Sequence, residues 1–64
     1  MWVKHKKQLV NLENVVSIDV FGNNINFAIG SFVANFRYKT EDECNKAYVK
    51  LYDGIVTKKE FVEI

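Results

Sequence analysis

The sequence has little of the chemistry that small domains use to reinforce themselves. Among 64 residues there are one cysteine, Cys44, one histidine, His5, and no proline. A single cysteine excludes an intrachain disulfide, and one thiol with one imidazole falls short of the four ligands of a structural zinc site. A domain of this length buries only about 60% of the surface that its unfolded chain exposes, so marginal stability is expected. Oligomerisation is the remaining reinforcement.

Long apolar runs and a strong net charge are also missing. No apolar run approaches the roughly 18 residues of a membrane span, and residues 1–10 are too polar for the hydrophobic part of a signal peptide. The formal net charge of +1 predicts no general attraction to nucleic acid or to a membrane. We therefore expect a cytoplasmic protein without a membrane contact, which agrees with a free thiol.

The composition is that of a folded domain. Hydrophobic residues make up 48% of the chain and charged residues 27%, with five Phe, three Tyr and one Trp. This is enough apolar material for a core. Because no linker, repeat or low-complexity stretch interrupts the chain, we expect one domain over residues 1–64.

Alternating apolar and polar residues predict strands. The alternation covers residues 16–20, 25–29 and 32–38. Gly22, Asn23 and Asn24 separate the first two stretches, and Gly30 with Ser31 separates the second and third. These residues tolerate a positive φ and can close hairpins, so the three strands should form an antiparallel meander.

A further hairpin is predicted upstream, from residues 2–4 and 8–12. Its tip is His5, Lys6 and Lys7, and a turn over residues 12–15 would lead into the meander.

A helix is predicted from Thr40 onward. Thr40 and Glu43 have the spacing of a capping box, and three acidic residues in the first turn suit the positive end of the helix dipole. One apolar stripe follows at spacings of three and four: Cys44, Ala47, Tyr48, Leu51 and Ile55. Asp53 and Gly54 are the expected stop. The tail, residues 58–64, fits either an edge strand or a frayed end.

These elements predict a two-layer α+β fold. An antiparallel meander of four to five strands would bury one apolar face under a single C-terminal helix packed across it. The face is expected to consist of Val16, Ile18, Val20, Ile25, Phe27, Ile29, Phe32, Ala34, Phe36 and Tyr38.

The order of these motifs also resembles a group of short bacterial and phage proteins. The resemblance rests on residues 2–4, on residues 9–18 and the two strands after them, on an aromatic at Tyr38, on the acidic helix start, and on Ala47, Tyr48 and Leu51. It implies a pared-down pleckstrin-homology-like sheet closed by a C-terminal helix. The group has no shared activity, so the resemblance implies a fold and no reaction.

The scarce reactive residues do not predict an enzyme. Cys44 begins the helix, but the neighbouring acids oppose a thiolate and its place on the apolar stripe predicts a core position. His5 lies in a lysine-flanked turn, where a solvated imidazole is expected. No phosphate-binding glycine loop or metal-spaced pair is present. We expect no catalytic residues, no metal and no cofactor.

Two groups of residues are candidates for binding. The first is basic and aromatic, and could grip an anion while the indole stacks on a base: Trp2, Lys4, Lys6, Lys7 and Arg37. The alternative is that these lysines are solvated or protect a strand edge. The second group should point away from the helix and could form an interface: Phe21, Ala28 and Val33. The alternative there is scattered exposed apolar side chains without a role.

Three functional hypotheses follow. The first is a non-catalytic interaction protein, self-associating, of the kind that a phage or mobile element uses to occlude a host macromolecule. The second is sequestration of an anionic small molecule such as a nucleotide signal, an anti-defence activity. The third is weak nucleic-acid binding through the N-terminal basic residues, which the near-neutral charge disfavours. The expected partners are thus a second copy, a foreign protein or an anionic ligand.

Overall fold

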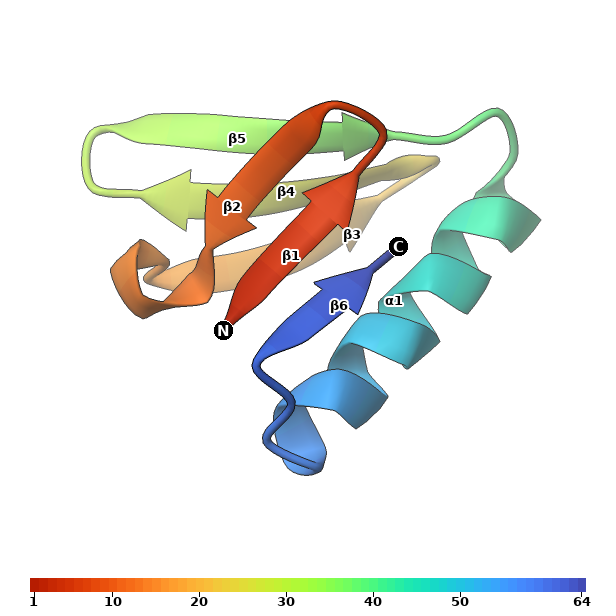
Figure 1. Ribbon diagram of the computed structural model, residues 1–64. Helices are drawn as coiled ribbons and strands as arrows, with labels where there is room; N and C mark the ends of the chain where they lie inside the picture. The colour runs from red at the N-terminus through yellow and green to blue at the C-terminus, as the bar shows by residue number, and fades with distance from the viewer.

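A computed structural model describes residues 1–64 and contains six strands, one short 3-10 helix and one α-helix (Figure 1). The elements in chain order are β1 (Trp2–His5), β2 (Gln8–Asn11), η1 (Leu12–Asn14), β3 (Ser17–Phe21), β4 (Asn24–Ile29), β5 (Phe32–Arg37), α1 (Glu41–Val56) and β6 (Phe61–Glu63).

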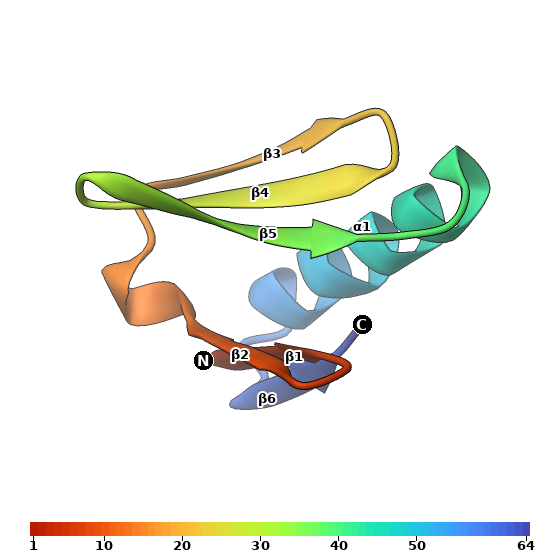
Figure 2. The ribbon, with the colours of Figure 1, turned by 90° about the horizontal axis from the view of Figure 1, so that it is seen from above.

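The strands form two three-stranded sheets. One is the predicted antiparallel meander, in the order β3-β4-β5. The other has the order β2-β1-β6, with β1 antiparallel to β2 and parallel to β6. The tail therefore contains a strand at residues 61–63. Figure 2 shows the two sheets facing each other, with α1 beside them.

The α+β class is confirmed, whereas the prediction of one meander of four to five strands under a helix is wrong. The N-terminal hairpin does not extend the meander, because β1 pairs with β6. The second sheet covers the meander in place of the helix, and α1 closes the side between them (Figures 1 and 2).

Both predicted turns of the meander are confirmed. Gly22 and Gly30 have φ values of +62° and +59°, and each is the first residue of a two-residue turn. This is the position that a type II′ hairpin turn gives to glycine, because a side chain there is strained.

The core lies between the two sheets and α1. Its largest fully buried side chains are Phe27, Phe36, Ile25, Leu51, Val3 and Cys44. The rings of Phe27 and Phe36 pack edge to face at 4.8 Å. Two residues of the expected apolar face, Val16 and Phe32, are exposed instead. They flank the Gly30 end of the meander, which extends away from α1 in Figure 1.

The start of α1 is as predicted, and its end is not. Thr40 Oγ1 accepts a hydrogen bond from the Glu43 N–H at 3.1 Å. The helix continues through Gly54 to Val56, so the predicted stop at Asp53 and Gly54 is wrong. Gly54 is buried, and a Cβ atom there would lie 2.6 Å from Val62 Cγ2. The glycine lets β6 approach the helix closely.

Candidate functional site

The predicted basic group is divided between two places. Lys6 and Lys7 form the β1–β2 turn, which lies beside the end of β5, where His5 Nε2 donates to the Arg37 carbonyl at 3.1 Å. Trp2 lies four residues back along β1, about 13 Å from the turn. It pairs in register with Phe61 on the outer face of its sheet. The structure therefore does not bring Trp2 to the lysines of the turn.

Lys4 lies on the same outer face as Trp2. Its Nζ is 3.9 Å from Glu63 Oε2, and the two side chains are 41% and 61% exposed. An exposed pair of this kind contributes little to stability.

A polar pocket of about 610 Å³ lies between the β1–β2 turn and α1. Three lysines line it, Lys6 from the turn and Lys46 and Lys50 from successive turns of α1, together with Glu43 and Glu63. Lys46 and Lys50 were not among the binding residues predicted from the sequence. Their spacing of four residues was the available indication that they share a face.

His5 is buried, so the expectation of a solvated imidazole is wrong. Only 7% of the residue is exposed, and its ring lies 4.4 Å from that of Tyr38 and 5.2 Å from that of Phe36. Along β1, His5 alternates inward with Val3. The hairpin lies over the meander, and this turns the imidazole into the core.

Cys44 and Tyr38 are core residues with suppressed ionisation. Burial, with a smaller contribution from Glu41, raises the pKa of the Cys44 thiol. Burial, with a smaller contribution from Cys44, raises the pKa of Tyr38 to about 12. The Tyr38 hydroxyl donates to the Ile64 main-chain oxygen at 3.0 Å. The prediction that Cys44 fills the core is confirmed, and a protonated, enclosed thiol is a poor nucleophile.

The outer face of the meander is divided by polar residues. Asn26 Nδ2 donates to Asp19 Oδ1 at 3.2 Å, and Asn35 Nδ2 donates to Asn26 Oδ1 at 2.6 Å. Phe21 and Val33, which are 79% and 61% exposed, lie at opposite corners beyond this row, about 16 Å apart by strand spacing. Ala28, half-buried, pairs with Val33. Their role as an interface remains a prediction.

A larger apolar surface lies on α1 and beside β3. The helix buries Cys44, Ala47, Leu51 and Gly54 and leaves a second apolar stripe exposed: Tyr48, Val49, Tyr52, Ile55 and Val56. These five positions span about 120° of the helix circumference. We call this stripe, with Val16 immediately before β3 and the groove between them, the α1–β3 surface.

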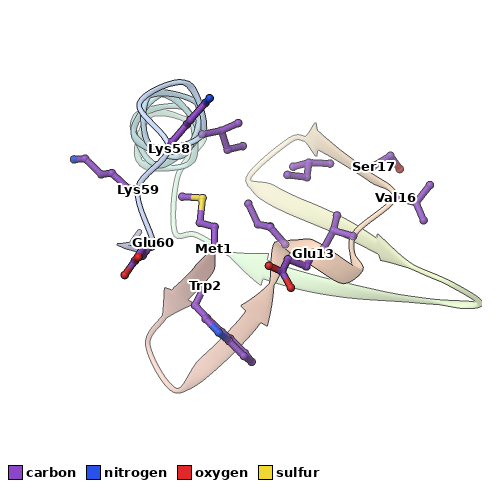
Figure 3. Close-up of a pocket in the computed structure, with 12 residues that line it drawn as sticks. Met1, Trp2, Glu13, Val16, Ser17, Lys58, Lys59 and Glu60 are labelled. Atoms are coloured by element: carbon purple, nitrogen blue, oxygen red, sulfur yellow. The ribbon is translucent and has the colours of Figure 1, made fainter.

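The groove of the α1–β3 surface has a volume of about 910 Å³ (Figure 3). Its apolar lining includes Met1, Leu12, Val15, Ile18 and Ile55. Figure 3 shows Lys58 and Lys59 on the helix side, and Glu13 and Val16 on the β3 side.

This surface was not predicted from the sequence, because Tyr48 and Ile55 were expected on the helix stripe that packs into the core. The spacing of Val49, Tyr52 and Val56 was the indication of a wider apolar face than a core stripe needs.

Comparisons with protein-family models, with curated proteins and with solved structures each give no significant match. The helix of this chain is not long and apolar enough to cross a membrane. No three His, Cys, Asp or Glu side chains lie close enough together to hold a metal ion. The function is therefore inferred from the surfaces described above.

Proposed function

We propose that this protein is a non-catalytic interaction protein that binds an apolar protein surface through the α1–β3 surface. The observation that supports this best is the exposed stripe, because five of the twelve large exposed apolar side chains lie together on one side of α1. Exposed apolar residues scattered singly are ordinary, whereas a contiguous patch with an open groove marks an interaction site.

The size of the surface supports the proposal. A whole aromatic side chain has an area of roughly 200 Å². The exposed fractions of Tyr48 and Tyr52 therefore correspond together to about 200 Å² of exposed surface. Val16, Val49, Ile55 and Val56 add about 250 Å² at roughly 100 Å² for each whole side chain. The total of about 450 Å² lies in the range of the largest patches on monomers, which are often functional.

The other two outer faces offer less. Trp2, Leu9 and Phe61 share the outer face of the β2-β1-β6 sheet, but Lys4 and Glu63 share it with them. The outer face of the meander is divided by its Asp and Asn row. The groove makes the α1–β3 surface concave.

Selection of displayed random peptides on the immobilised protein tests the proposal. We expect apolar peptides whose binding shifts the NMR resonances of Val16, Tyr52 and Ile55. Tyr52→Ala should abolish this binding, and Phe21→Ala, which truncates an exposed aromatic elsewhere, should not. Peptides that map to an outer sheet face, or that bind Tyr52→Ala unchanged, would refute it.

A second candidate function is suggested by the polar pocket. Its three lysines outnumber its two glutamates, so an anionic small molecule such as a nucleotide could bind there. A thermal-shift screen against mononucleotides and cyclic dinucleotides should then give a ligand whose effect Lys50→Ala removes. Lys39→Ala, which lies outside the pocket, is the control. An unchanged shift in Lys50→Ala would reject this site.

A further inference from the structure

We infer that the partner of the α1–β3 surface is a second copy of this chain, which adds its own β3 antiparallel to β3 across a twofold axis. This inference rests on the proposed function and specifies its partner. The resulting dimer would have one continuous six-stranded sheet made from two meanders.

The apolar area fits such a dimer. A standard interface buries about 800 Å² on each partner, of which roughly 60% is apolar, or about 480 Å². The six exposed side chains of the α1–β3 surface offer about 450 Å². No other face of the chain offers as much.

The charges around the groove are balanced, as a self-complementary surface requires. Lys58 and Lys59 line it together with Glu13 and Glu60. A rim of one sign would repel its own copy. Because the lysines and Glu13 lie on opposite sides of the groove, a copy running in the opposite direction can place a base against an acid (Figure 3).

The two edges of the meander differ in their hydrogen bonding. On β5, two of the carbonyls that point away from β4 are occupied: Gln8 Nε2 donates to the Asn35 oxygen, and His5 Nε2 to the Arg37 oxygen, each at 3.1 Å. The N-terminal hairpin thus covers that edge.

The edge of β3 has no such cover. The Tyr38 N–H donates to the Asn23 oxygen, so Tyr38 and Asn23 form a hydrogen-bonded pair. Hydrogen-bonded and non-hydrogen-bonded pairs alternate along an antiparallel ladder, so this pair fixes which residues of β4 direct their main-chain groups to β5 and which direct them to β3. Ser17, Asp19 and Phe21 therefore direct their main-chain groups to β4, and Ile18 and Val20 direct theirs outward. Neither outward residue accepts a side-chain hydrogen bond, and β3 has no lysine or proline to prevent pairing with another strand.

The charge of Asp19 favours a twofold axis at Ile18 over one at Asp19 itself. With the axis at Ile18, the two Ile18 residues exchange main-chain hydrogen bonds. The Val16 N–H donates to the Ala28 oxygen at 2.8 Å and stays bonded to β4, so the new ladder is centred on Ile18. Asp19 then lies opposite Ser17. An axis one residue later would place the two Asp19 carboxylates directly opposite each other, which is destabilising.

Two substitutions matched in chemistry and exposure test the interface. Val56, in the α1–β3 surface, and Val33, on the outer face of the meander, are each 61% exposed. In sedimentation equilibrium, the wild type should reach twice the 7.5-kDa chain mass. Val56→Glu should raise the dimer Kd at least about 100-fold, because an unpaired charge is buried twice at a twofold interface. Val33→Glu should leave it unchanged.

Amide hydrogen exchange tests the pairing of β3. The Ile18 and Val20 amides should be protected at high protein concentration and exchange quickly on dilution, while the amides bonded to β4 stay protected. Rapid exchange at every concentration, or a dimer that Val33→Glu splits and Val56→Glu does not, would overturn the inference. A wild type that is monomeric at high concentration would also overturn it. The proposed function would survive that result if selected peptides still bound the groove.

Discussion

Replacing Gly54 by alanine tests whether helix propensity or tertiary packing determines the residue at this position. In an exposed helix interior, Gly→Ala stabilises by about 1 kcal/mol. Here the new Cβ would lie 2.6 Å from Val62 Cγ2 and 3.0 Å from Met1 Cε, inside the roughly 3.5–4.0 Å optimum for carbon contacts. Overpacking of this kind costs about 1–3 kcal/mol. Set against the helix-propensity gain, this cost should make Gly54→Ala lower the free energy of unfolding by up to about 2 kcal/mol.

A double-mutant cycle tests whether the contact with Val62 causes this loss of stability. Unfolding in urea is monitored by circular dichroism. Val62→Ala removes the nearer obstruction, and the terminal methyl of Met1 can move aside. In the Val62→Ala background, Gly54→Ala should then be neutral or stabilising by up to about 1 kcal/mol. If Gly54→Ala stabilises the wild type, or has the same effect in both backgrounds, the close approach of β6 to α1 does not determine the identity of this residue.

Three further outcomes are expected. Thr40→Ala should cost about 1 kcal/mol in denaturant titrations, because the Glu43 N–H loses its acceptor, and an unchanged midpoint would contradict this. Cys44 should react slowly with a thiol reagent in the native protein and quickly after unfolding, and fast native labelling would show that it is accessible. The pKa of Tyr38 in the folded protein is about 12 against an ordinary value of 10.0, so the folded state keeps its phenol protonated to a higher pH. Stability should therefore fall between pH 10 and 12, by at most about 2.7 kcal/mol before solvent screening, and the fall should be smaller in Tyr38→Phe.

Local features of the sequence predicted the local structure. The alternation of apolar residues and the glycines at positions 22 and 30 identified β3, β4 and β5 and both turns, because period and positive φ are properties of a few adjacent residues. The Thr40 cap identified the first turn of α1 for the same reason.

The candidate site was less predictable. The basic group was chosen because its residues are near one another in sequence, but the extended β1 separates Trp2 from Lys6. The stripe on α1 was visible in the sequence as apolar positions, but not as an exposed surface. A helix pattern shows which residues share a face, and it does not show which face a neighbouring sheet will cover.

The sequence by itself determined the α+β class, the meander, its turns and the start of the helix. Only the tertiary structure decided that residues 61–63 pair with β1, that His5 is buried, and that Gly54 lies inside the helix. The reason is that each of these depends on the return of β6 or of the N-terminal hairpin from a distant part of the chain. The β1–β6 pairing joins residues 59 positions apart, and no local period or propensity encodes which distant strand will pair with β1.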